Sequence, residues 1–89
     1  MELINVPLQV IVHCEAGGDL RPLRFRYEDE NHAVHTVQIE QITDSRKSSF
    51  VGIDAIHYIC KGKEQGREHL YELKYTVNTH KWVLFRRIY

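Results

Sequence analysis

The stretch HLYELKYTVNTHKWVLFRRIY, residues 69–89, decides the fold class of this 89-residue chain. Two apolar and aromatic segments flank the polar tetrapeptide NTHK at 78–81, which is the sequence pattern of a β-hairpin. In the first segment Tyr71, Leu73 and Tyr75 occupy every second position, as the residues on one face of a strand do. We therefore expect two antiparallel strands joined by a short turn.

A helix over residues 68–75 is the alternative, because Leu70, Leu73 and Val77 also fit a helical stripe. The segment is short and no capping residue precedes it. Residues 75–77, YTV, favour strands. The strand is the better prediction.

The last segment has apolar side chains on both of its faces. Trp82, Leu84 and Ile88 share one parity, while Phe85 and Tyr89 share the other. A strand with one face in water normally carries polar residues there. The excess apolar surface is expected to pack in the protein's own core, against a second copy, or against a ligand.

The first half of the chain predicts two further strands, 8–14 and 23–28, separated by a turn at Gly17-Gly18-Asp19. Their expected inward residues are Leu8, Val10, Val12, Cys14, Leu23, Phe25 and Tyr27. The charged run 28–32, EDENH, is expected to form an exposed hairpin tip.

The middle of the chain predicts a strand over 34–43, a loop over 44–49 that is the most mobile segment, and a strand over 50–61. The parity of the apolar residues changes twice. We expect a β-bulge at Glu40-Gln41, and a bulge or a sharp bend at Asp54-Ala55, where that parity changes.

These segments predict one all-β domain over residues 1–89. Five to six antiparallel strands with short connections make a meander, and a meander this small leaves unpaired edges unless it curls into a closed or nearly closed barrel of the SH3-like kind. The formal net charge is zero, so the whole molecule exerts no long-range attraction on nucleic acid or on an anionic membrane. No apolar run approaches the length of a membrane-spanning helix, and the N-terminal segment resembles a strand rather than a signal peptide.

Two cysteines without a secretion signal indicate the reducing cytoplasm. Cys14 and Cys60 both lie on expected inward faces, where we expect them to act as small apolar side chains. The alternative is that their strands are neighbours, which would bring the two sulfurs within bonding range. His13-Cys14 and His57-x-x-Cys60 place their side chains on opposite strand faces, so neither pair predicts a metal site. No catalytic motif is present in the sequence, so we expect neither an enzyme nor a cofactor.

The basic residues give the best indication of function. Small β-barrels bind nucleic acid by combining basic side chains with aromatic rings on which bases stack. The candidate binding residues are Arg24, Arg26, Arg46, Lys47, Phe85, Arg86, Arg87 and Tyr89. The alternative is a protein-interaction or homodimerising domain that uses the edge of the C-terminal strand, at Val83, Phe85 and Tyr89.

The chain resembles a class of small bacterial domains of unknown function in four segments: 21–27, RPLRFRY; Val37-x-Ile39; 71–75, YELKY; and 82–86, WVLFR. Those domains share a Pro-x-x-Phe-x-aromatic strand and a closing Tyr-x-Leu-x-Tyr…Trp-x-Leu-x-Arg hairpin. The resemblance implies a compact, barrel-like, all-β unit without catalytic residues. Some of the similar domains occur beside DNA-handling proteins, which favours a nucleic-acid ligand.

Overall fold

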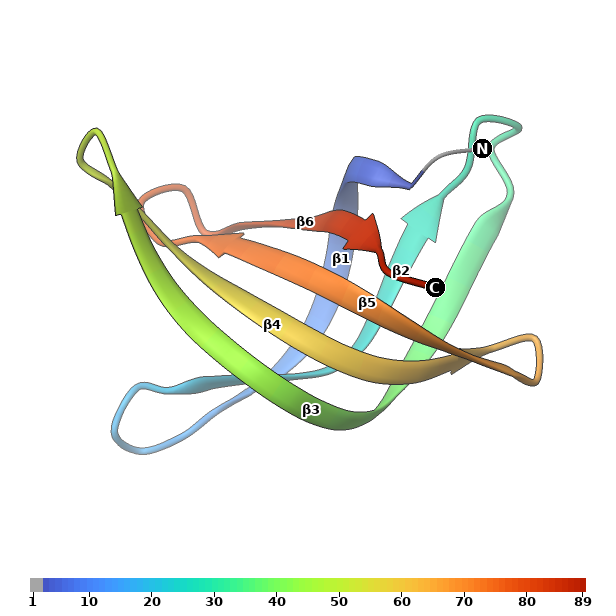
Figure 1. The fold of residues 1–89 in the computed structure, drawn as a ribbon, viewed down its shortest axis with the longest axis horizontal. Helices are drawn as coiled ribbons and strands as arrows, with labels where there is room; N and C mark the ends of the chain where they lie inside the picture. The colour runs from blue at the N-terminus through green and yellow to red at the C-terminus, as the bar shows by residue number, and fades with distance from the viewer. Residues whose placement is uncertain (1–2) are drawn as a thin grey trace.

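The computed structural model describes residues 3–89, which form six antiparallel strands and no helix. The strands follow one another around a closed barrel in chain order, as predicted for an all-β meander (Figure 1). Their bounds are β1 (Ile4–Cys14), β2 (Leu20–Glu28), β3 (Val34–Phe50), β4 (Ile53–Glu64), β5 (Arg67–Thr76) and β6 (Lys81–Arg87). Within these residues there is no helix that is long and apolar enough to cross a membrane.

The barrel closes within one chain because β1 divides its pairing between two neighbours. Its first half, from Ile4 to Leu8, pairs with β6, and its second half, from Gln9 to Cys14, pairs with β2. Strand β6 therefore has β5 on one side and β1 on the other. The prediction of a free C-terminal strand edge is wrong, since both edges of β6 are occupied.

Aromatic side chains from β2, β4 and β5 fill the barrel. The edge of the Phe25 ring meets the face of Tyr71 at 5.1 Å between centroids, a favourable geometry for two aromatic rings. The buried cluster consists of Phe25, Tyr27, Val37, Tyr58, Cys60, Tyr71, Leu73, Tyr75 and Leu84. The alternation in 71–75 is thus that of a strand, and the helical alternative is excluded.

Two of the turns are two-residue hairpin loops. Val51-Gly52 joins β3 to β4, and Gln65-Gly66 joins β4 to β5. All four residues have positive φ, between 51° and 77°, which is the conformation of a type I′ turn. Strand β4 pairs with β3 and β5 without an extra residue, so the predicted bulge or bend at 54–55 is wrong. The parity of the apolar residues changes because Val51 lies in the turn and Ile53 is 52% exposed.

The bulge predicted at Glu40 is confirmed. Ile39 pairs with Gly62 and Gln41 with Lys61, so Glu40 is an extra residue on β3. A bulge that was not predicted lies on β2, where Leu23 is extra opposite Ile11 and Val12. Leu23 was expected to point inward, but it is 41% exposed because this bulge turns it out of the barrel.

The segment 44–49 is not the mobile loop that its composition predicted. It is the continuation of β3, paired residue by residue with β4. Only β4 pairs with this part of β3, since β2 pairs with Val34–Gln38 alone. A strand with one neighbour and exposure on both faces favours polar residues, which is why DSRKSS resembles a loop in sequence.

The two cysteines occupy different environments. Cys60 is buried in the core, whereas Cys14 is exposed at the end of β1, so its predicted inward orientation is wrong. Both are free thiols. Burial raises the pKa of the Cys60 thiol to about 12, so this side chain is un-ionised and acts as a core residue.

Candidate functional site

The outer face of β3 to β6 is the first region where functional side chains gather. Tyr58 and Leu73, which face each other across β4 and β5, point into the core, so their chain neighbours point outward. The register then aligns Arg46, His57 and Lys74 in one row across β3, β4 and β5. We call this surface the outer face.

A bulge on β6 adds an aromatic ring to this face. Leu73 pairs with Leu84 and Glu72 with Arg86, so Phe85 is the extra residue between them. Phe85 and Arg86 would lie on opposite faces of a regular strand, but the bulge places both on the outer face. Lys74 Nζ lies 5.9 Å from the Phe85 ring centroid, and the His57 and Phe85 rings are nearly perpendicular with their centroids 5.5 Å apart.

A carboxylate is buried beneath these side chains. Glu72 is only 3% exposed, although it belongs to the outer face. Arg86 Nε donates to one carboxylate oxygen at 2.9 Å, and His57 Nδ1 lies 2.9 Å from the other. Burial raises the pKa of Glu72, but the hydrogen bonds from Arg86 and His57 outweigh it, so that the pKa is lowered and the group stays ionised.

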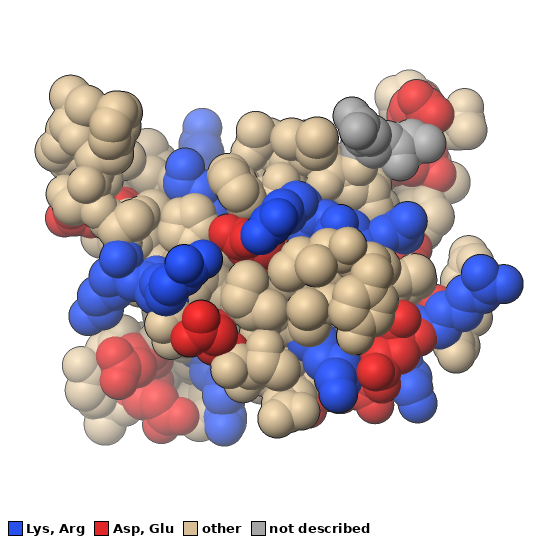
Figure 2. Space-filling view, viewed as in Figure 1, with Lys and Arg blue, Asp and Glu red and all other residues tan. Residues whose placement is uncertain are grey.

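Three cations on the outer face have no carboxylate partner within residues 3–89. They are Arg46, Lys74 and Lys81. By contrast, Lys61 and Lys63 form exposed ion pairs with Glu68 and Glu40, both at 3.8 Å. Figure 2 shows Lys and Arg side chains as a band over β6, with acidic side chains beside it. The face has a local positive excess on a molecule that is neutral overall.

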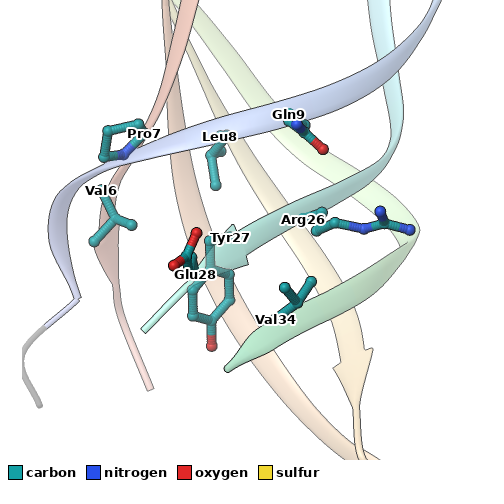
Figure 3. Close-up of a pocket in the computed structure, with 8 residues that line it drawn as sticks. All are labelled: Val6, Pro7, Leu8, Gln9, Arg26, Tyr27, Glu28 and Val34. Atoms are coloured by element: carbon teal, nitrogen blue, oxygen red, sulfur yellow. The ribbon is translucent and has the colours of Figure 1, made fainter. Parts of the chain in front are cut away.

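Arg24 and Arg26 do not join this face. They lie on β2, between β1 and the first part of β3, on the far side of the barrel from the viewer in Figure 1. Figure 3 shows Arg26 at the rim of a groove of about 480 Å³, extending away from Tyr27 and Leu8, which line it. The predicted binding residues are therefore divided between two sides of the molecule.

The remaining predicted residues lie in three other places. Lys47 pairs with Ile56 and faces the loop between β1 and β2. Arg87 pairs with Tyr71 and lines a pocket at one mouth of the barrel. Tyr89 is 59% exposed, and its carbonyl accepts hydrogen bonds from the Leu70 backbone amide and from His69 Nδ1. Of the eight predicted residues, the structure brings Arg46, Phe85 and Arg86 together.

The mouth of the barrel holds a polar network that the sequence did not indicate. The Tyr27 hydroxyl donates to Glu64 at 2.9 Å, and the Tyr71 hydroxyl donates to the same carboxylate at 3.1 Å. His35 lies between two acids, with Nδ1 2.5 Å from Glu64 and Nε2 2.8 Å from Asp29. A ring that donates from both nitrogens is an imidazolium.

The ionisation of this network follows from its hydrogen bonds. The hydrogen bond to Asp29 has the largest effect on His35, and it stabilises the charged ring and raises its pKa. Glu64 raises this pKa further, whereas burial lowers it. The same His35 contact, with backbone donors from Ala33, lowers the pKa of Asp29. Burial and the neighbouring Glu64 carboxylate raise the pKa values of Tyr27 and Tyr71, which therefore remain hydroxyl donors.

The sequence did not predict two groups of residues, those that the register adds to the outer face and those of the polar network at the mouth. His57 and Lys74 belong to the outer face only through the register of β4 and β5. Glu64 lies outside the strand predicted over 50–61, and His35 is one polar residue of the strand predicted over 34–43. The available signal was weak: two tyrosines of inward parity, at 27 and 71, need partners for their hydroxyls when they are buried.

No family model, curated protein or solved structure matches this chain. The resemblance to small bacterial domains of unknown function therefore remains a prediction.

Proposed function

We propose that the protein is a cytoplasmic, non-catalytic binding module that holds single-stranded nucleic acid on its outer face. The observation that carries this proposal is the cross-strand row of Arg46, His57 and Lys74 beside the bulged Phe85. The two free thiols agree with a reducing compartment.

The physical argument rests on two short-range effects rather than on net charge. A base that stacks on the partly exposed Phe85 ring gains about 1–3 kcal/mol. Lys74 already lies over this ring, and its flexible stem lets the ammonium follow the phosphate of the stacked nucleotide. Arg46 and Lys81, on either side along the sheet, contact the neighbouring phosphates. Because these three cations have no carboxylate partner within residues 3–89, binding breaks no ion pair there.

The test is the fluorescence anisotropy of a labelled single-stranded oligonucleotide titrated with the protein at several salt concentrations. With three phosphate contacts, the logarithm of the association constant should decrease linearly with the logarithm of the salt concentration, with a slope of about −2. Lys74→Gln should reduce this slope by about 0.7, and Phe85→Ala should weaken binding about tenfold or more at every salt concentration.

Arg24 and Arg26 provide the matched control, because they are also arginines on an outward strand face but lie on β2. The double variant Arg24→Gln/Arg26→Gln should bind as the wild type does. Absence of binding at low salt, or a loss in the control variant that equals the loss in Lys74→Gln, refutes the proposal.

A second candidate function is homodimerisation, and its location differs from the predicted C-terminal edge. From Gln41 to Phe50, β3 pairs with β4 alone and leaves its other edge without a strand neighbour among the described residues. At the turn that follows, Phe50 and Val51 are 79% and 83% exposed. In Figure 1 this turn projects away from the β1–β2 turn, which leaves the arm accessible.

The charges on this edge favour one antiparallel register. Two identical strands related by a twofold axis pair residues of equal parity. Centring the axis on Ser45 places Asp44 opposite the second copy's Arg46, and the reverse. Centring it on Arg46 or Asp44 instead places like charges opposite each other, which is unfavourable.

Sedimentation equilibrium tests this second candidate. The register predicts a dimer that Arg46→Asp disrupts, because the substitution makes the opposed charges alike, and that the swap Asp44→Arg/Arg46→Asp restores. A strictly monomeric protein at high concentration removes this candidate and leaves the nucleic-acid proposal untouched.

A further inference from the structure

A pocket of about 460 Å³ opens at the mouth of the barrel that holds Glu64. Its lining comes from Leu3 before β1, the end of β2 with the turn that follows, the start of β3, the β4–β5 turn with the strand ends beside it, and the end of β6. Its walls include the apolar Leu3 and the Tyr27 ring, which stacks on His35 at 4.8 Å with the planes inclined by 8°. The volume is that of a small-molecule site.

The two acids in this pocket have their acceptor oxygens occupied. Glu64 receives both tyrosine hydroxyls and His35. Asp29 receives the other His35 nitrogen and the backbone amides of Asn31 and Ala33. Glu64 therefore has no free lone pair for a ligand cation, and the one lone pair that remains on Asp29 Oδ2 lies beside the His35 imidazolium.

The groups that remain for a ligand are donors. Arg67 and Arg87 line the pocket, and neither has a carboxylate partner within residues 3–89. Gln65 adds an amide beside them. With His35 as an imidazolium, three cations face two anions, so the lining has an excess of positive charge.

We propose that this pocket binds a small organic oxyanion, a carboxylate or a phosphate monoester, between Arg67 and Arg87. The planar guanidinium forks match both head groups, and the organic part of the ligand packs on Leu3 and Tyr27. The Asp29–His35–Glu64 chain is a positioning element, because it fixes the Tyr27 wall and neutralises the acids beneath the ligand. This site is distinct from the outer face and does not depend on the proposed function.

The test is calorimetric titration of the protein with three ligands that share one ring and differ in head group: benzoate, phenyl phosphate and phenol. We expect saturable one-to-one binding of at least one of the two anions and none of the neutral phenol. The stronger of the two anions identifies the head group. Arg67→Gln and Arg87→Gln should each weaken it about tenfold, as expected for the loss of a charge-assisted hydrogen bond.

Two controls separate this result from loss of the fold and from the nucleic-acid site. Arg24→Gln/Arg26→Gln and Lys74→Gln should bind the anion as the wild type does, and unfolding monitored by the single tryptophan, Trp82, should show that every variant is folded. The proposal is overturned if neither anion binds, if phenol binds as tightly as the anions, or if the arginine substitutions at 67 and 87 leave the affinity unchanged.

Discussion

Two glutamates among residues 3–89 are buried, and they are held in different ways. Glu64 lies at the mouth of the barrel and accepts hydrogen bonds from Tyr27, Tyr71 and His35, side chains of three different strands. Glu72 lies on the outer face and is held by neighbours on the two adjacent strands, of which the Arg86 side chain is 55% exposed.

The difference indicates which of the two regions can rearrange. Around Glu64 the hydroxyl donors are buried and have no other partner, so the network joins β2, β3, β4 and β5 as one unit. Around Glu72 the guanidinium is in contact with water, so Arg86 stays solvated when its carboxylate partner is removed. We therefore regard the mouth as rigid scaffold and the outer face as the adaptable surface.

The largest expected effect is that of Glu64→Ala. The substitution leaves two buried tyrosine hydroxyls and one nitrogen of His35 without their acceptor. Loss of one member of a buried charged network costs about 3 kcal/mol or more. Urea unfolding at neutral pH measures this directly. A loss below about 1 kcal/mol would show that the mouth is not the scaffold.

Glu72→Ala should cost less, about 1–2 kcal/mol, because water can solvate the exposed Arg86 once its partner is gone. The same substitution should strengthen oligonucleotide binding, since it frees Arg86 and His57 for phosphate. One additional contact makes the salt slope steeper by about 0.7. If Glu72→Ala destabilises the protein as much as Glu64→Ala does, the contrast between the two regions fails.

The smallest effect concerns pH. The pKa of His35 is raised in the folded protein, so its contribution to stability is complete below the unfolded value of about 6.5 and is lost as the pH rises through the folded value. Stability should decline as the pH rises above about 6.5, and His35→Gln should flatten this decline.

The pKa values of Asp29 and Glu72 are lowered, so their contributions act in the opposite direction and are lost as the pH falls below about 4. The midpoint of urea unfolding, measured across the pH range for the wild type and for His35→Gln, tests both the decline at high pH and the decline at low pH. An equally steep decline above pH 6 in the variant would contradict the assignment to His35.

The sequence predicted the fold class because alternation survives wherever a strand has one buried face. Phe25, Tyr27, Tyr71 and Leu73 all point inward as their parity required. The bulge at Glu40 was predictable because Ile39 and Ile42 both need burial and have opposite parity. Residues 44–49 have only one neighbouring strand, so the alternation of apolar and polar residues disappears there. Their polar composition therefore wrongly predicted a loop.

The candidate site was less predictable because it depends on irregularities. Phe85 and Arg86 would lie on opposite faces of a regular strand, and only the bulge brings the two together. Lys74 and His57 reach the outer face through the pairing of β4 with β5, which no local pattern specifies. The network at the mouth depends on Tyr27, His35 and Glu64, residues far apart in sequence that only barrel closure assembles.

The central claim is that the outer face, and not the β2 side of the barrel, holds single-stranded nucleic acid. A two-dimensional amide NMR titration with an unlabelled oligonucleotide tests it most directly. The claim predicts that the largest shifts fall at Arg46, His57, Lys74 and Phe85, while Arg24 and Arg26 remain unshifted. Shifts centred on β2, or no shifts at low salt, would contradict it.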